Sequence, residues 1–178
     1  INALKGFVET SGREFSILED ATIKAGEWLI DPVNVTIDTT LASTIQTALG
    51  VGDVTITTDG DNTPSTTIGE SGTDGDINVE ADISWSTNTL TLNAHRNINV
   101  NANLANLAGE NSGLNLITGS SGDVLVGFNS DGTFKGKVDL DSSSSININS
   151  EAYTIVTNVT QLQAMTIYNY VLGNNIDA

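Results

Sequence analysis

The stretch NINVNANL, residues 97–104, alternates asparagine with Ile98, Val100, Ala102 and Leu104. Successive side chains of a β-strand point to opposite faces, so this alternation predicts one apolar face and one face of amides. Short triplets with the same apolar–polar–apolar order recur along the chain. They are Phe15-Ser16-Ile17, Val35-Thr36-Ile37, Val54-Thr55-Ile56, Ile77-Asn78-Val79, Ile98-Asn99-Val100, Val124-Leu125-Val126 and Ile146-Asn147-Ile148.

The starts of these triplets lie 20, 19, 23, 21, 26 and 22 residues apart. A period in that range is typical of a solenoid of stacked coils. Further triplets, such as Leu90-Thr91-Leu92 and Leu114-Asn115-Leu116, fall between them, as expected when each coil carries two or three strands. Equivalent side chains of successive coils lie about 4.8 Å apart, so asparagine amides can hydrogen-bond along the stack. The pattern predicts an all-β fold, a parallel β-helix.

Two segments depart from plain coils. In LASTIQTALG, residues 41–50, apolar side chains recur at helical spacing, with Thr39 or Thr40 placed to cap the helix and Gly50 to end it. A similar unit, NVTQLQAMTI at residues 158–167, lies between Tyr153-Thr154-Ile155 and Tyr170-Val171-Leu172. We therefore expect one or two short helices inserted between strands.

Composition narrows the function classes. The chain has 178 residues, 38% of them hydrophobic, and no Pro/Gly-rich linker, so residues 1–178 are expected to form a single segment with one core. Six Lys and Arg stand against 22 Asp and Glu, and the formal charge of −16 opposes binding to nucleic acids and anionic membrane surfaces.

With no cysteine, neither disulfides nor thiolate metal sites can form. No apolar run approaches the roughly 20 residues that span a bilayer, so no membrane insertion is expected.

Several segments carry a family resemblance: KGFVETSG (residues 5–12), WLIDPVNVTI (28–37), VTITT (54–58), ISWSTNTLTLNAHRNINVNANL (83–104) and YVLGNNIDA (170–178). In these the chain resembles filamentous-haemagglutinin-like exoproteins, which Gram-negative bacteria export by two-partner secretion. The resemblance implies a right-handed parallel β-helix and a place in the secreted or cell-surface fraction. It also implies that residues 1–178 are a fragment of a longer exoprotein, downstream of the secretion domain.

The function that the resemblance implies is non-enzymatic. The segment would be a β-helical shaft of a virulence-associated adhesin and would contribute to host-cell or cell-cell adhesion through a surface receptor or glycan. The outer-membrane transporter would recognise a region that is not in this chain. Self-assembly through unpaired strand edges is a second non-enzymatic alternative.

The enzymatic alternative is a β-helical polysaccharide lyase or a tailspike-like glycosidase. A lyase could use the adjacent His95 and Arg96 to abstract a proton, although a solvated turn explains them as well. Glycoside hydrolysis could use a carboxylate pair, Asp74 with Asp76 or Asp139 with Asp141. Residues two apart lie on the same side of a strand, however, and not across a sugar from each other.

A polar, acidic loop begins at Thr57 and ends at Asp76. We suggest it as the partner-binding segment, and Asp59, Asp61, Asp74 and Asp76 as ligands of a structural Ca²⁺, because hard cations prefer oxygen ligands. No calcium motif of fixed spacing is present, so a solvated acidic face is the alternative, and no other cofactor is expected. The acidic cluster as a whole is Asp59, Asp61, Glu70, Asp74, Asp76, Glu80 and Asp82.

The remaining candidate functional residues are aromatic side chains and glycosylation sequons. Trp28, Trp85 and Tyr168 could stack on sugar rings if they are exposed. The neighbours of the two tryptophans place them inward instead. Asn34-Val35-Thr36 and Asn158-Val159-Thr160 match the glycosylation sequon, a short motif that is frequent by chance in a chain rich in Asn and Thr.

Overall fold

The computed structural model describes residues 1–12, 15–58, 75–107, 112–166, 169–173 and 176. It is mostly β, with 49% in strands and 11% in helices, which confirms the expected predominance of strands. The elements are β1 (Asn2–Ser11), β2 (Lys24–Asp31), β3 (Val35–Ile37), α1 (Thr39–Leu49), β4 (Asp53–Thr57), β5 (Ile77–Val79), β6 (Ile83–Trp85), β7 (Asn88–Ala94), β8 (Ile98–Val100), β9 (Leu104–Asn106), β10 (Ser112–Thr118), β11 (Val124–Val126), β12 (Val138–Leu140), β13 (Ser145–Ile148), β14 (Glu151–Val156), α2 (Val159–Gln163) and β15 (Tyr170–Leu172).

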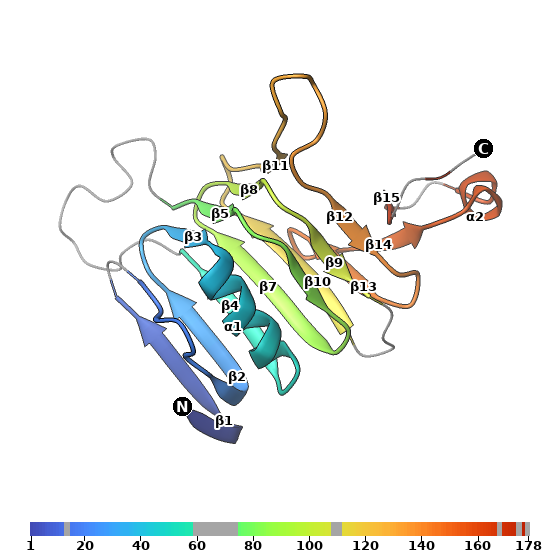
Figure 1. Cartoon of the computed structure of the whole chain (residues 1–178). Coiled ribbons are helices and arrows are strands. Elements are labelled where there is room, and N and C mark those ends of the chain that lie inside the picture. The colour runs from blue at the N-terminus through green and yellow to red at the C-terminus, as the bar shows by residue number, and fades with distance from the viewer. Residues whose placement is uncertain (13–14, 59–74, 108–111, 167–168, 174–175, 177–178) are drawn as a thin grey trace.

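These strands form three sheets (Figure 1). The eight-stranded sheet has the order β1-β2-β4-β7-β10-β13-β14-β15, the four-stranded sheet β11-β8-β5-β3, and the three-stranded sheet β12-β9-β6. Among the described residues, every pair of neighbouring strands in these sheets is parallel except β13 with β14. Parallel neighbours need a crossover connection, so the chain must leave each sheet and return to it.

The chain visits the sheets in a repeating order. It passes from the four-stranded to the three-stranded to the eight-stranded sheet through β5-β6-β7, again through β8-β9-β10, and again through β11-β12-β13. In the preceding passage α1 stands between β3 and β4, where the three-stranded sheet would supply a strand. Gln46 of α1 accepts hydrogen bonds at its Oε1 from the backbone and hydroxyl of Ser84 in β6, at 2.9 and 3.0 Å. The helix therefore lies beside β6, at the edge of the three-stranded sheet where a further strand would pair.

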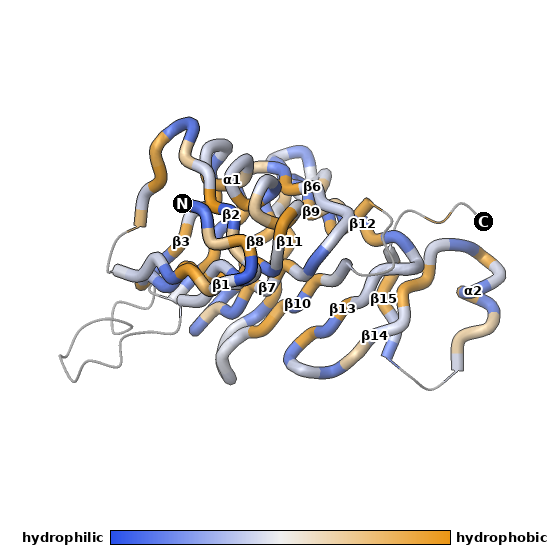
Figure 2. The backbone as a smooth tube through the Cα atoms, turned by 90° about the horizontal axis from the view of Figure 1, so that it is seen from below, coloured by the Kyte–Doolittle hydropathy of each residue, from blue (hydrophilic) through white to orange (hydrophobic). Residues whose placement is uncertain are grey.

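The core consists of apolar columns that run across the strands in register. Ile77 pairs with Ile98 in the four-stranded sheet, and both are fully buried. Val54, Leu90 and Leu114 form an equivalent buried column in the eight-stranded sheet. Figure 2 shows apolar and polar positions alternating along strands such as β7 and β10. Burial of each such side chain contributes about 1.5–3 kcal/mol.

The seven triplets of the sequence do not all occupy equivalent places, which corrects the simple period. Those starting at Val35, Ile77, Ile98 and Val124 belong to the four-stranded sheet, whereas Val54 and Ile146 begin triplets of the eight-stranded sheet. Equivalent starts in the four-stranded sheet are therefore 42, 21 and 26 residues apart. The intervals near twenty residues arose partly because the counted triplets belong to two different sheets.

The expectation of a strand at Phe15-Ser16-Ile17 is wrong. These residues form no strand, and Phe15 and Ile17 are half-buried side chains that pack against the core. The turn that follows lies against α1, where the Thr44 hydroxyl donates to the Ala21 carbonyl at 3.4 Å. The apolar alternation here serves packing of a connecting segment, without backbone pairing.

The two short helices are confirmed, with one correction to their caps. Asp38 caps α1, because its Oδ1 accepts from the Leu41 backbone N–H at 2.9 Å; Thr39 and Thr40 already lie within the helix. Gly50 follows the last residue, as expected. The second helix, α2, has no buried residue, and Leu162 is 39% exposed. Within the described part of the chain, no helix is long and apolar enough to cross a membrane.

Candidate functional sites

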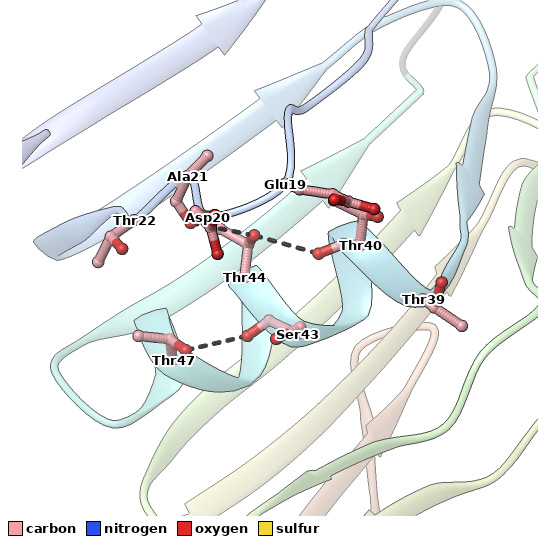
Figure 3. A pocket seen from close by; sticks show the side chains of 9 residues that line it. All are labelled: Glu19, Asp20, Ala21, Thr22, Thr39, Thr40, Ser43, Thr44 and Thr47. Atoms are coloured by element: carbon pink, nitrogen blue, oxygen red, sulfur yellow. Dashed lines mark hydrogen bonds between the residues drawn. The ribbon is translucent and has the colours of Figure 1, made fainter.

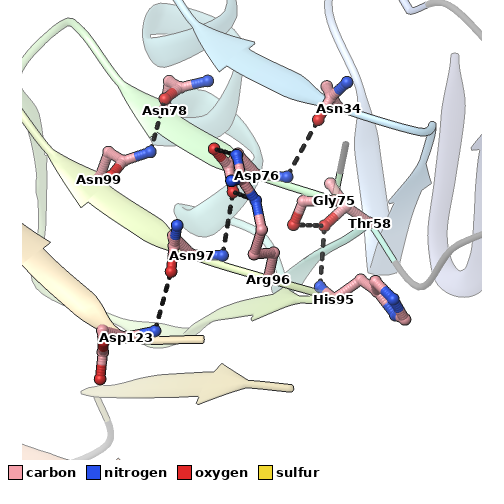
Figure 4. Close-up of polar contacts among 10 residues, drawn as sticks. All are labelled: Asn34, Thr58, Gly75, Asp76, Asn78, His95, Arg96, Asn97, Asn99 and Asp123. Atoms are coloured by element: carbon pink, nitrogen blue, oxygen red, sulfur yellow. Dashed lines mark hydrogen bonds and ion pairs between the residues drawn. The ribbon is translucent and has the colours of Figure 1, made fainter. Parts of the chain in front are cut away.

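A ladder of side chains borders the four-stranded sheet (Figure 4). Asn34, Asp76, Asn97 and Asp123 each stand immediately before a strand, β3, β5, β8 and β11. The side-chain oxygen of each of the first three accepts the backbone N–H of the next, at 3.0 Å in every case. We call these four residues the Asx ladder. It continues the hydrogen bonding of the sheet by one position and holds the strands in register.

Asp76 is the charged member of the Asx ladder. Its carboxylate accepts from Arg96 Nε at 2.8 Å, and Arg96 Nη2 bonds its second oxygen. Asp76 is buried, so the guanidinium supplies the charge that a buried carboxylate needs. A Ca²⁺ at Asp76 would compete with Arg96 for the same carboxylate.

The other predicted calcium ligands, Asp59, Asp61 and Asp74, lie outside the described residues, as does most of the loop suggested for partner binding. Among the residues that are described, no group of three or more His, Cys, Asp or Glu could hold a metal ion. The calcium hypothesis therefore stays a prediction for the undescribed carboxylates.

The predicted His95–Arg96 pair does not converge on one point. Arg96 is occupied with Asp76, whereas the exposed imidazole of His95 points away from both (Figure 4). The backbone N–H of His95 donates to the Thr58 hydroxyl at 3.1 Å, and that hydroxyl donates to the Gly75 carbonyl at 2.8 Å. The arrangement ties neighbouring strands together, and the His95 imidazole does not face the Arg96 guanidinium.

The carboxylates proposed for glycoside hydrolysis also have local partners. Asp139 forms an ion pair with Lys137, and Asp141 accepts from the Ser143 hydroxyl at 2.6 Å and from its backbone N–H at 2.9 Å. The two hydrogen bonds from Ser143 lower the pKa of Asp141 below its usual value. A general acid for glycoside hydrolysis needs the opposite shift. Asp74, the proposed partner of Asp76, lies outside the described residues.

Both tryptophans belong to the core, as their neighbours predicted. Trp28 is 1% exposed and donates from Nε1 to the Thr10 hydroxyl at 3.0 Å, and Trp85 is 5% exposed. Neither can stack on a sugar. Tyr168 lies outside the described residues. Of the sequon asparagines, Asn34 belongs to the Asx ladder and Asn158 caps α2 by accepting from the Gln161 N–H at 2.9 Å.

A projecting hairpin carries the aromatic surface that the sequence interpretation missed. Between β11 and β12 the chain leaves the sheets (Figure 1). Phe128 and Phe134 are paired there in an isolated antiparallel bridge. Their ring centroids are 4.8 Å apart, and they are 61% and 65% exposed. The available signal was a pair of aromatic residues flanking the turn sequence Asn-Ser-Asp-Gly in a chain that is only 5% aromatic.

Polar contacts hold this hairpin, residues 127–137, in one conformation. The backbone N–H of Asn129 donates to the Thr133 carbonyl at 2.8 Å, and that of Lys135 donates to the Gly127 carbonyl at 2.7 Å. Asp131 accepts from the Thr133 hydroxyl and N–H at 2.6 and 2.9 Å, which lowers the pKa of Asp131. Gly132 adopts the positive φ of 83° that the turn requires.

A cavity of about 440 Å³, widely open to solvent, lies between α1 and the turn that precedes β2 (Figure 3). The helix contributes the hydroxyls of Thr39, Thr40, Ser43 and Thr47, and the turn contributes the carboxylates of Glu19 and Asp20. Sequence analysis gave no sign of it, because hydroxyls spaced along the outer side of a helix are indistinguishable from an ordinary solvated face.

Comparison with known proteins assigns the chain to no family. No protein-family model, no curated protein and no solved structure matches the chain. The resemblance to filamentous-haemagglutinin-like exoproteins therefore stays a prediction from the quoted segments. The functional argument rests on the described residues.

Proposed function

We propose that this chain is a right-handed parallel β-helix, a segment of a large secreted exoprotein displayed on the surface of a Gram-negative bacterium. The segment acts as a shaft and presents the hairpin of Phe128 and Phe134 to a receptor on a host or bacterial cell. The observation that carries this proposal is the repeated passage through the three sheets in one order, from β5 to β13, from which the aromatic hairpin projects.

The proposed shaft draws its rigidity from interactions between coils. Each coil buries an apolar column against its neighbour, and outward amides bond from coil to coil, as between Asn99 Nδ2 and Asn78 Oδ1 at 2.8 Å. A second amide pair joins Asn147 Nδ2 to Asn115 Oδ1 at 2.8 Å. Such nearest-neighbour contacts make a solenoid stiff along its axis and extendable by further coils.

The proposed adhesive surface follows from the exposure of the hairpin. Two adjacent aromatic rings that are more than half exposed cost solvation free energy in isolation, and aromatic residues are over-represented among those that dominate protein interfaces. The polar turn contacts of Asp131 and Asn129 keep the hairpin ordered before binding, which lowers the entropy lost on association. Such a hairpin suits a receptor that offers an apolar pocket.

The charge of the chain fits an extracellular segment that must not bind polyanions. A formal charge of −16 favours solubility and opposes nonspecific attachment to nucleic acid and anionic lipid. Export would depend on an outer-membrane two-partner secretion transporter that recognises a region outside this chain.

Cell binding by the isolated chain tests the proposal. Fluorescently labelled protein is measured on host epithelial cells and on bacteria, as wild type and as the double variant Phe128→Ser/Phe134→Ser. Both phenylalanines are exposed, so the variant keeps its far-UV circular dichroism and melting temperature. The matched control is Leu18→Ser, since Leu18 is 83% exposed and lies in a different connection.

We expect the double variant to lose at least about tenfold in apparent affinity, because two aromatic contacts at an interface centre each contribute more than about 1 kcal/mol. The control keeps wild-type binding. Equal binding by the folded double variant would remove the hairpin from the proposal. If the wild type binds neither cell type saturably, the adhesive function is wrong and only the shaft function remains.

A further inference from the structure

We propose that the cavity between α1 and the turn at residues 19–22 is a binding site for a neutral or amino saccharide unit. It is an open depression of about 440 Å³, a volume that can accept one sugar ring, and its exposed lining leaves one side of a ligand in water. This site is separate from the aromatic hairpin and does not depend on the adhesive function proposed above.

The chemistry of the lining selects a polyhydroxyl ligand. One wall presents the hydroxyls of Thr39, Thr40, Ser43 and Thr47 along α1, and the other presents two carboxylates (Figure 3). A hydroxyl both donates and accepts, and a carboxylate accepts from two hydroxyls at once. Vicinal hydroxyls of a sugar supply the complementary donors and acceptors. Of the described side chains that line the cavity, Ala21 alone is apolar.

The charge of the lining excludes anionic sugars. Glu19 and Asp20 are both acidic, and none of the described lining side chains is basic. A uronate or a sialate would meet like charge in the cavity and from the chain as a whole. An amino sugar would instead gain a charge-assisted hydrogen bond to a carboxylate.

Both walls are held in place before any ligand binds. The buried side of α1, with Leu41, Ile45 and Leu49 at most 3% exposed, anchors the helix to the core. The single hydroxyl proton of buried Thr44 is shared between the Thr40 carbonyl at 3.1 Å and the Ala21 carbonyl at 3.4 Å, so this side chain links the turn to the helix. Asp20 holds a positive φ of 66°, a conformation that Asp tolerates better than most residues.

Some polar groups are available for a ligand. Thr47 donates its hydroxyl proton to the Ser43 carbonyl at 3.0 Å, so its hydroxyl oxygen can still accept. The Ser43 hydroxyl and the Glu19 carboxylate are exposed and enter the cavity. They are the groups whose removal should weaken saccharide binding without disturbing the fold.

The test is a titration of the isotope-labelled 178-residue chain followed by amide NMR. The probes are glucose, mannose, galactose, N-acetylglucosamine and glucosamine; glucuronic acid and N-acetylneuraminic acid form the anionic arm, and calcium chloride alone the cation arm. At least one neutral or amino sugar is expected to shift amides of residues 19–22 and 39–47 in a saturable way. The anionic sugars are expected to leave them unshifted.

Variants locate the site. Glu19→Gln and Ser43→Ala are each expected to raise the dissociation constant about fivefold, as loss of one hydrogen bond does. Glu151→Gln and Ser86→Ala, exposed residues outside the cavity, are matched controls and should leave the constant unchanged. Phe128→Ser/Phe134→Ser should also leave it unchanged, which separates this site from the hairpin.

Three results would overturn the proposal. The first is no saturable shift with any neutral or amino sugar. The second is equal binding of an anionic sugar, and the third is a response of the cavity amides to calcium with no response to sugar. Loss of cell binding by the hairpin variant has no bearing on any of them.

Discussion

Asn99 Nδ2 donates to Asn78 Oδ1 at 2.8 Å, and the two residues are register partners in β8 and β5. Their neighbours Ile77 and Ile98 point the opposite way and are fully buried. One strand pairing thus sets both an apolar column inside and an amide pair outside. The amide ladder that the asparagine alternation predicted is confirmed at this pair.

The Asn78–Asn99 pair should contribute measurable coupling to stability. Asn78→Ala and Asn99→Ala are each expected to lower the free energy of unfolding by about 1 kcal/mol, the usual net value of one hydrogen bond. The double variant should lose less than the sum, since both changes remove the same bond. Urea unfolding of the four proteins measures the coupling. Additive losses would mean that the amides act independently.

Asp76 should be the most costly carboxylate to remove among the described ones. Asp76→Ala leaves the partly buried Arg96 guanidinium and the Asn97 N–H without this acceptor, and we expect a loss of about 3 kcal/mol. Asp76→Asn retains one acceptor for Asn97 and should lose less. Exposed Asp82→Ala, which removes an acceptor for the Asn103 N–H, is the comparison for a single lost bond.

Gly122 should tolerate no side chain, because the backbone of Arg96 approaches it closely. A Cβ at this position would stand 1.6 Å from the Arg96 carbonyl oxygen, which is backbone and cannot turn aside. Gly122→Ala should therefore destabilise by at least about 2 kcal/mol, as overpacking does. Gly6→Ala, whose Cβ would meet its nearest atom at 3.4 Å, should cost far less. Thermal melting of both variants decides the point.

The hairpin turn should depend on pH through Asp131. The hydrogen bonds from Thr133 lower the pKa of this carboxyl in the folded chain below its usual value of 3.8. A depressed pKa stabilises the turn above the unfolded value, and that contribution is lost as the pH falls through the folded value. The Thr133 amide resonance should follow a titration with its midpoint below 3.8, and Asp131→Asn should abolish it. A midpoint above 3.8 would contradict the hydrogen bonds.

The strand pattern was predictable because it is local. The alternation at residues 97–104 reports directly which side chains face inward, and the buried Ile98, Val100, Ala102 and Leu104 confirm it. The helical spacing of Leu41, Ile45 and Ala48 was equally local and placed α1 correctly.

The assignment of strands to sheets was not predictable from the same pattern. A triplet such as Val54-Thr55-Ile56 has the same composition as Val35-Thr36-Ile37, yet the two belong to different sheets. The triplet itself therefore does not decide which sheet it joins. The cap of α1 was misplaced for a related reason, since Asp38, Thr39 and Thr40 are all capable N-caps.

Functional-site residues were harder to predict than sheet membership, because the exposure of a side chain depends on the residues that surround it in the fold. The neighbours of Trp28 and Trp85 correctly placed both rings in the core, but the sequence interpretation passed over Phe128 and Phe134, which project from it. Only the departure of residues 127–137 from the sheets makes those two rings accessible.

In-register pairing of the parallel strands is the central claim, and engineered disulfides test it most directly because the chain has no cysteine. Oxidation of the double variant Asn78→Cys/Asn99→Cys is followed by mass spectrometry. The control is Asn78→Cys/Asn101→Cys, in which the second cysteine lies two residues, or roughly 6.6 Å, further along the chain from the register partner of residue 78. Register partners lie within the Cα separation that a disulfide accepts, about 4.4–6.8 Å. We predict rapid, complete cross-linking of the first pair and little of the second. Equal cross-linking of both pairs, or faster cross-linking of the second, would contradict the stack.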